Sequence, residues 1–163
     1  MNKPLEDQSA ENASNFRLEK HIPYLLVRSS NQIGGITQKL YQDTTPAGLT
    51  LSLREFRTLL IVAVRGFVGP AAVADATGMD RSTVTRALAT LRSKGLVEES
   101  PNENDKRAKV LKLTDKGRVL CDEIFPKMAA YDDLLDAEFS KDEINQFKSI
   151  LNRLVYLFVK SSS

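Results

Sequence analysis

Two short helical segments joined by a tight turn constrain the fold of this chain more than any other feature. Pro70 suits the first turn of a helix, because its ring fixes φ and its missing N–H is not needed there. Gly78 suits the left-handed residue that follows a helix end, and Asp80 can cap the next helix. The inward apolar stripe of that second helix is Val84, Leu88 and Leu91. The pattern predicts a helix-turn-helix.

A β-hairpin is predicted directly after the second helix, which closes at Gly95. Residues 96–100 and 109–113 have the pattern of two short strands, and the polar segment 101–107 between them indicates a turn. Apolar periodicity predicts four more helices: from Ile22 to near Asp43, from about Leu53 to Arg65, from Thr114 to about Asp136, and after Ser140. The expected fold class is mainly α with a small β-wing.

These elements divide the chain into four parts. We expect an N-terminal tail at residues 1–16, an N-terminal helical segment at 17–46, a winged helix-turn-helix lobe at 50–114, and C-terminal helices at 115–163. Capping boxes support two of the helix starts, since each pairs a serine with a glutamate three residues later. The pairs are Ser52 with Glu55 and Ser140 with Glu143.

The last predicted helix carries more apolar surface than one small domain needs to bury. We therefore predict that it meets a second copy of the chain, as in a homodimer. The alternative is that it completes its own core. The residues expected at the dimer interface are Ile144, Phe147, Ile150, Leu151, Leu154 and Phe158.

Composition argues against several function classes. With one histidine, His21, and one cysteine, Cys121, the chain lacks the ligands of a usual zinc site. It also lacks the glycine-rich phosphate-binding patterns and the G-x-S-x-G elbow of hydrolases. We therefore expect no metal, no cofactor and no catalytic residues; the only faint catalytic pairing is His21 with Tyr24.

Neighbouring Leu120 and Ile124 favour a buried, inert Cys121 thiol over a redox switch.

The chain lacks the features of a membrane or secreted protein. No stretch is long and apolar enough to cross a bilayer, and the first fifteen residues lack the apolar core of a signal peptide. These features predict a cytoplasmic protein that does not contact a membrane.

Positive charge is concentrated in the middle of the chain. The net charge is +2, yet residues 81–118 contain ten lysines and arginines against five acids. Such a block attracts phosphates, although a solvated face without a partner is the alternative.

The second helix of the helix-turn-helix is predicted to present a polar, partly cationic outer face. Because its apolar stripe faces inward, its hydroxyls and arginines cannot all be buried. Short hydroxyls let a helix approach the major groove closely, and an arginine fork can pair with guanine. The residues predicted to contact DNA are Arg81, Ser82, Thr83, Thr85 and Arg86. The alternative is that the hydroxyls only cap the helix and Arg86 is a solvated charge.

The hairpin tip adds a second candidate DNA contact. Lys106 and Arg107 lie at the tip, and Lys109 lies near its base. A slender basic loop can reach a phosphate or enter a narrow minor groove. Asp105 is expected to orient the guanidinium of Arg107 through a charge-assisted hydrogen bond.

In order along the chain, four segments resemble the multiple antibiotic resistance regulator (MarR) family. They are Met79-Asp80-Arg81-Ser82-Thr83-Val84-Thr85-Arg86, Leu91-Arg92-Ser93-Lys94-Gly95-Leu96-Val97, Asn104-Asp105-Lys106-Arg107-Ala108 and Leu113-Thr114-Asp115-Lys116-Gly117. The helical layout suits the family from about residue 20 to 158. The resemblance implies a homodimeric repressor that binds pseudo-palindromic double-stranded DNA operators. It also implies that the helices in 17–46 and 115–163 form a dimerisation layer.

The same resemblance suggests roles for single residues. It implies that Ser82, Thr83, Thr85 and Arg86 are recognition-helix contacts and that Arg107 is the wing arginine, with Asp105 as its partner. Lys106 stands where the family often has another arginine, which keeps the charge but weakens a bidentate role.

A small effector is the least constrained part of the prediction. Residues 21–28 and 51–57 resemble segments of family members associated with aromatic-acid catabolism, and the resemblance implies release from DNA by an aromatic or anionic compound. His21, Tyr24 and Arg28 have the spacing of one helical face, and Arg57 lies on the next helix. An arginine in an apolar cleft can hold a carboxylate. The alternative is an ordinary salt bridge for Arg28 or Arg57 and a place at the edge of the core for Tyr24.

The sequence thus predicts a ligand-responsive transcriptional repressor. The competing hypothesis from another class is a winged-helix protein-interaction module that does not read DNA. It would bury the wing and the recognition face against a protein.

Overall fold

The structure, a computed structural model, describes residues 17–46, 48–66, 68–101 and 109–161. The chain divides into two compact units, residues 1–43 and 44–163, which are described separately. In the first unit, the short 3-10 helix η1 (Leu18–Lys20) precedes the long helix α2 (Ile22–Thr44), whose last residue belongs to the second unit.

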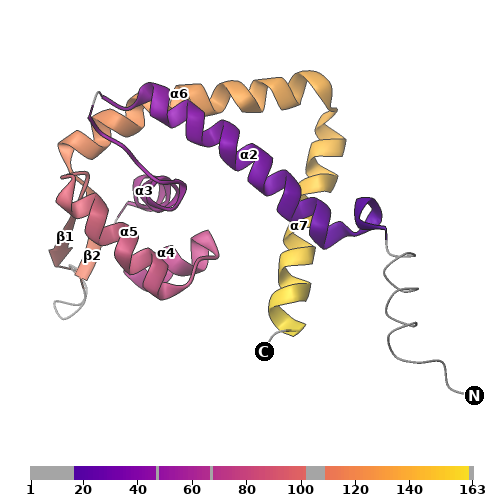
Figure 1. Ribbon diagram of the computed structural model, residues 1–163, viewed down its shortest axis with the longest axis horizontal. Helices are drawn as coiled ribbons and strands as arrows, with labels where there is room; N and C mark the ends of the chain where they lie inside the picture. The colour runs from indigo at the N-terminus through magenta and orange to yellow at the C-terminus, as the bar shows by residue number, and fades with distance from the viewer. Residues whose placement is uncertain (1–16, 47, 67, 102–108, 162–163) are drawn as a thin grey trace, which may run out of the picture. The chain divides into compact units, whose positions relative to one another are not determined.

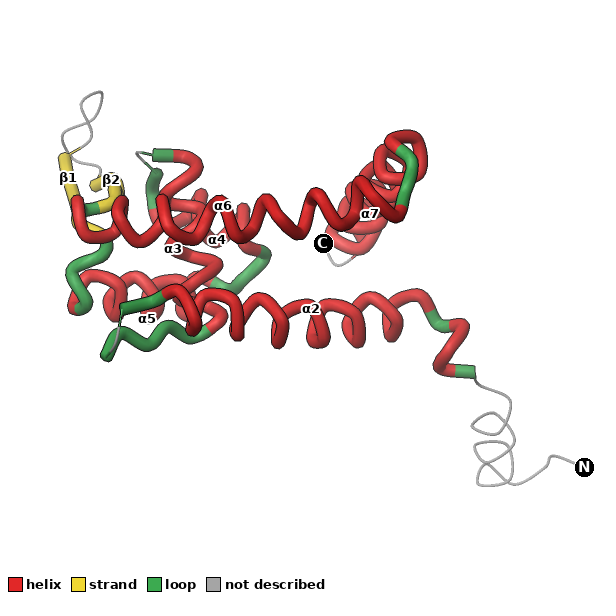
Figure 2. The backbone as a smooth tube through the Cα atoms, turned by 90° about the horizontal axis from the view of Figure 1, so that it is seen from above, coloured by secondary structure: helices red, strands yellow, loops and turns green. Residues whose placement is uncertain are grey.

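The second unit contains the predicted helix-turn-helix and hairpin (Figure 1). Its elements in chain order are α3 (Leu53–Arg65), α4 (Pro70–Thr77), α5 (Arg81–Ser93), β1 (Val97–Pro101), β2 (Lys109–Leu113), α6 (Asp115–Glu138) and α7 (Lys141–Ser161). The pair β1 and β2 forms the only sheet among the described residues (Figure 2). The predicted fold class, mainly α with a small β-wing, is confirmed.

Side-chain caps start helices at the predicted residues. In both capping boxes the serine oxygen accepts a backbone N–H and the glutamate accepts the N–H of the serine, so two otherwise unpaired donors are satisfied. The capping residues are Ser52 and Glu55 at α3, Asp80 at α5, Thr114 at α6, and Ser140 and Glu143 at α7. Helix α6 continues through Pro126 to Glu138, close to its predicted end near Asp136.

The core of the winged helix-turn-helix lies among α3, α4, α5 and the hairpin. The apolar stripe of α5 is buried as predicted, and it meets buried side chains of α3 and α4. The fully or almost fully buried side chains here are Phe56, Leu59, Val62, Val73, Val84, Leu88, Leu91, Leu96, Val97 and Leu111. Burial of this stripe leaves the opposite side of α5 facing outward.

A Schellman motif ends α5, and because of it the first strand begins later than predicted. Gly95 has φ of 69°, in the left-handed region that glycine tolerates best. The N–H of Leu96 donates to the carbonyl of Leu91 at 3.0 Å, and the N–H of Gly95 donates to Arg92 at 2.9 Å. Because the amide of Leu96 is used in this turn, the first strand begins at Val97 and ends at Pro101, one residue later than predicted at each end.

The hairpin pairs antiparallel, from Val97 with Leu113 to Pro101 with Lys109. Val68, between α3 and α4, also exchanges two backbone hydrogen bonds with Leu111, at 2.8 and 3.2 Å. Sequence reasoning missed this contact, which ties the helix-turn-helix to the wing. The predicted tip residues Asp105, Lys106 and Arg107 lie outside the described residues.

The start of α6 holds the turn that closes α5, residues 94–96, through three successive carbonyls. Thr114 Oγ1 donates to the carbonyl of Gly95 at 2.6 Å, and the N–H of Thr114 donates to Leu96 at 3.1 Å. Lys116 Nζ donates to the carbonyl of Lys94 at 2.9 Å. A Cβ on Gly117 would lie 2.0 Å from the carbonyl oxygen of Leu96, so only glycine allows this approach.

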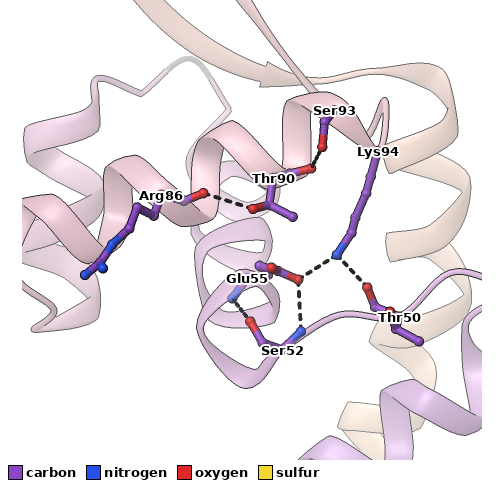
Figure 3. A network of polar contacts seen from close by, with 7 residues as sticks. All are labelled: Thr50, Ser52, Glu55, Arg86, Thr90, Ser93 and Lys94. Atoms are coloured by element: carbon purple, nitrogen blue, oxygen red, sulfur yellow. Dashed lines mark hydrogen bonds and ion pairs between the residues drawn. The ribbon is translucent and has the colours of Figure 1, made fainter.

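The side chain of Lys94 fixes the closing turn from the other side (Figure 3). Its Nζ donates to the carbonyl of Thr50 at 2.6 Å and pairs with Glu55 Oε2 at 2.8 Å. The same Glu55 oxygen accepts the N–H of Ser52 in the capping box. The closing turn of α5 is therefore held by the starts of both α3 and α6.

We predict that Gly117→Ala lowers the free energy of unfolding by about 1–3 kcal/mol, because the new Cβ pushes the start of α6 away from Leu96. Urea unfolding followed by circular dichroism measures this. The exposed neighbour Arg118 supplies the control, and Arg118→Ala should change the stability by no more than about 0.5 kcal/mol. Equal stability of Gly117→Ala and the wild type would contradict the close contact.

Candidate nucleic-acid interface

The outer side of α5 displays the five residues predicted from the sequence. The side chains of Arg81, Ser82, Thr85 and Arg86 are exposed, and that of Thr83 is half-buried. Their common orientation follows from the burial of the apolar stripe on the opposite side. Contact of these residues with DNA stays a prediction.

Asp80 organises the first turn of this face. Its Oδ1 accepts the hydroxyl of Ser82 at 2.6 Å and the N–H of Thr83 at 2.8 Å, and its Oδ2 accepts the hydroxyl of Thr83 at 2.7 Å. These hydrogen bonds, led by that of Ser82, lower the pKa of the Asp80 carboxyl far below its ordinary value. The carboxylate is therefore ionised at neutral pH, and it can only accept hydrogen bonds.

Arg86 lies over the same turn. Its Nε donates to the carbonyl of Ser82 at 3.3 Å, and its Nη2 lies 3.5 Å from Ser82 Oγ and 3.4 Å from Thr83 Oγ1. The long distances indicate weak hydrogen bonds, which a nucleic-acid acceptor can replace at small cost.

Several other cations of the central basic block, unlike Arg81 and Arg86, form ion pairs with carboxylates in the described part of the chain. Arg92 pairs with Glu99, and Lys112 pairs with Glu98 at 2.9 Å. Lys94 is held by Glu55, as described above. Among the described residues, neither Arg81 nor Arg86 forms an ion pair with a carboxylate. The charges of Arg81 and Arg86 are thus available to a polyanion.

A small polar hollow of about 180 Å³ lies beside this face. The capping residue Ser52 and Arg54 and Glu55 of α3 line it together with residues of α5, including Thr83 and Arg86. Sequence reasoning did not assign Arg54 to this face. Arg54 is the second residue of α3 and is exposed. The capping box at Ser52, which the sequence showed, placed Arg54 in the first turn of this helix.

The predicted effector residues lie in both units of the structure. His21 precedes α2, and its carbonyl accepts the N–H of Leu25 at 3.0 Å; Tyr24 and Arg28 are exposed residues of α2. Arg57 is an exposed residue of α3 in the other unit. A shared site for these four residues stays a prediction.

Several predicted dimerisation residues of α7 are open to solvent. Phe147 is 60% exposed, and Ile150 and Phe158 are exposed by about half. Ile144, Leu151 and Leu154 are half-buried. The last helix therefore does not cover its whole apolar surface within its own unit.

Cys121 is buried, and burial raises the pKa of its thiol to about 11. The thiol is therefore protonated and poorly reactive at neutral pH, in line with the sequence interpretation. Within the described residues, no three histidine, cysteine or acidic side chains are grouped as a metal site requires. None of the described helices is long and apolar enough to span a membrane.

Comparison with known proteins agrees with the fold. The family model described as "MarR family" matches residues 47–108. The multiple antibiotic resistance protein MarR of Salmonella typhimurium is 27% identical over 110 residues, covering 66% of this chain and 75% of that protein.

Two solved structures are similar over most of the chain. CouR from Rhodococcus jostii, bound to p-coumaroyl-CoA, superposes with a TM-score of 0.71 at 25% identity and covers 85% of this chain and 94% of that one. FabT from Streptococcus pneumoniae, in complex with DNA, superposes with a TM-score of 0.66 at 25% identity. The match covers 87% of this chain and 97% of that one. Together with the helix-turn-helix, the wing strands and the outward face of α5, these similarities support a winged-helix transcriptional regulator of the MarR family.

Proposed function

We propose that the chain is a homodimeric repressor that binds a pseudo-palindromic operator and is released by a small, aromatic-acid-like effector. The observation that carries the proposal is the outward face of α5. There, Arg81 and Arg86 form no ion pair with a carboxylate among the described residues, while both ends of the helix are fixed by hydrogen bonds.

On this proposal α5 is the recognition helix. Its hydroxyls and the fork of Arg86 face base edges in the major groove, and Arg81 contacts the phosphate backbone. FabT, a similar protein, has been captured in complex with DNA, which supports this assignment. A repressor acts by covering promoter DNA, so binding at a promoter is sufficient for this activity.

The wing extends the contact on either side of the major groove. Lys106, Arg107 and Lys109 add charge for a phosphate or a narrow minor groove, and Asp105 orients Arg107. The lobe at residues 50–114 is then the DNA-binding part of each subunit.

The two subunits associate through the helices in residues 17–46 and 115–163. The exposed apolar side chains of α7 support this part of the proposal, because a large apolar patch in water is unusual on a monomer. A two-fold axis would present two recognition helices to successive major grooves, about 34 Å apart.

An effector completes the proposed cycle. CouR is bound to p-coumaroyl-CoA, an aromatic acyl compound, which supports an aromatic ligand class for a similar protein. In this chain His21, Tyr24, Arg28 and Arg57 are the proposed contacts. For release, the ligand must bind more tightly to the arrangement that cannot bind DNA.

We predict that Arg86→Ala lowers discrimination between specific and random duplexes by about 1–3 kcal/mol, because a base contact is lost. The probe is a set of duplexes enriched by the wild-type chain from a randomised pool, measured by fluorescence anisotropy. Affinity should also fall steeply as salt rises, since phosphate contacts release counterions.

Arg92→Ala is the matched control on the same helix. Glu99 already neutralises Arg92, so this change should leave discrimination nearly intact. Failure to enrich any duplex, or equal discrimination by Arg86→Ala and the wild type, would contradict the assignment.

We predict that Phe147→Glu shifts the chain from dimer to monomer in sedimentation velocity at micromolar concentration, because a charge enters the apolar interface. Phe147 is 60% exposed, so the monomer should keep its fold by circular dichroism. Val64→Glu changes an apolar residue of α3 that is 74% exposed, and this control should stay dimeric. A wild-type monomer under the same conditions would refute the proposed dimer.

A further inference from the structure

The outward face of α5, here called the recognition face, carries four hydroxyl groups, those of Ser82, Thr83, Thr85 and Thr90. Each donates its proton to an acceptor in α5 or in its capping residue Asp80. Ser82 and Thr83 donate to the carboxylate of Asp80, at 2.6 and 2.7 Å. Thr85 donates to the carbonyl of Arg81 at 2.8 Å. Thr90 donates to the carbonyl of Arg86 at 3.1 Å, as Figure 3 shows.

Chemistry decides the direction of each of these hydrogen bonds. An ionised carboxylate and a backbone carbonyl carry no proton that they could donate, so the hydroxyl must be the donor. Each hydroxyl has only one proton and two lone pairs. Once that proton is committed, the hydroxyl can only accept a hydrogen bond from a ligand.

The face therefore divides into acceptors and donors. The hydroxyl oxygens of Ser82 and Thr83 are acceptors, and the guanidinium groups of Arg81 and Arg86 are donors. Arg86 Nη2 already lies within 3.5 Å of both hydroxyl oxygens. When Arg86 turns to a base acceptor, lone pairs on both hydroxyls become available.

This division does not fit hydroxyl contacts to phosphate. A phosphate oxygen is an acceptor, so Ser82 or Thr83 could bind it only by giving up its bond to Asp80. The negative charge of Asp80 would also repel a phosphate placed beside these hydroxyls. In the major groove, by contrast, adenine N6 and cytosine N4 present amino groups that donate.

We propose that Asp80 sets the hydrogen-bond polarity of the recognition face, so that Ser82 and Thr83 read the amino group of an adenine or a cytosine. This inference rests on the proposed DNA readout by α5 and adds to it the class of base edge that the hydroxyls recognise. Asp80 is thus a positioning residue for specificity as well as a helix cap.

The test removes single amino groups from DNA. Duplexes enriched from a randomised pool by the full-length wild-type chain are resynthesised with one adenine replaced by purine, or one cytosine replaced by pyrimidin-2-one. Neither analogue carries the exocyclic amino group. At one or more positions, affinity for the wild type should fall about three- to tenfold, the effect of one hydrogen bond.

The same analogues are then measured with Ser82→Ala and Thr83→Val, which remove one hydroxyl each. At the position read by the missing hydroxyl, the analogue should cost the variant no affinity. Ser93→Ala is the matched control, since Ser93 lies at the other end of α5 and donates to the carbonyl of Thr90 at 2.8 Å. Its response to every analogue should equal that of the wild type.

Asp80→Asn tests the role of the carboxylate. Asparagine caps helices as well as aspartate does, so the fold should be kept by circular dichroism and thermal unfolding. When the amide oxygen keeps the cap in the place of Oδ1, the amide nitrogen takes the place of Oδ2. There it donates to the Thr83 hydroxyl, which frees the proton of that hydroxyl. Enrichment from the random pool should then yield a changed preference at the positions that the analogues identified.

The outcomes separate this inference from the proposed function. If no duplex is enriched by the wild type, both are overturned. If duplexes are enriched but no analogue is discriminated, or if the discrimination persists in both hydroxyl variants, only the polarity inference is overturned. Should Asp80→Asn fail to fold, the analogue measurements with Ser82→Ala and Thr83→Val decide the question.

Discussion

The hydrogen bonds that fix the two ends of α5 control what the rest of its surface can do. At the start, the carboxylate of Asp80 gathers a backbone amide and two hydroxyls. At the end, three carbonyls of the closing turn are held by α6, and the side chain of Lys94 reaches the capping box of α3. A helix fixed in this way can present exposed side chains to a ligand with little loss of conformational freedom on binding.

The distribution of ion pairs gives this surface its chemistry. Glu55, Glu98 and Glu99 neutralise cations near the closing turn and along the hairpin. Arg81 and Arg86, at the other end of α5, form no ion pair with a carboxylate among the described residues. Several cations of the central segment are therefore neutralised locally, while, within the described parts of the chain, the charges on the outward face of α5 are not.

Local signals in the sequence were sufficient to predict most of the helix-turn-helix. Caps at Ser52, Asp80 and Thr114, and the glycines at 78 and 95, act on neighbouring backbone groups, so their effects can be inferred from short spacings. The outward face of α5 followed from the apolar stripe for the same reason. Its contacts with DNA, like the dimer and the effector contacts, depend on partners outside a single chain.

Contacts between distant segments could not be predicted in this way. Gly117 fits against Leu96, and Lys94 reaches Glu55, only because tertiary packing brings α3, α5 and α6 together. The bridge between Val68 and Leu111 has the same origin. The direction of the hydroxyl hydrogen bonds also required coordinates, since the same residues could have donated outward to phosphate.

Dimethyl sulfate footprinting of an enriched duplex tests the central claim, that the exposed face of α5 reads DNA, most directly. The reagent methylates guanine N7 in the major groove, where the account places Arg86. The account predicts that the wild-type chain protects one or more guanines in each half-site and that Arg86→Ala loses this protection while still binding. Full reactivity of every guanine N7 in the occupied duplex would contradict it.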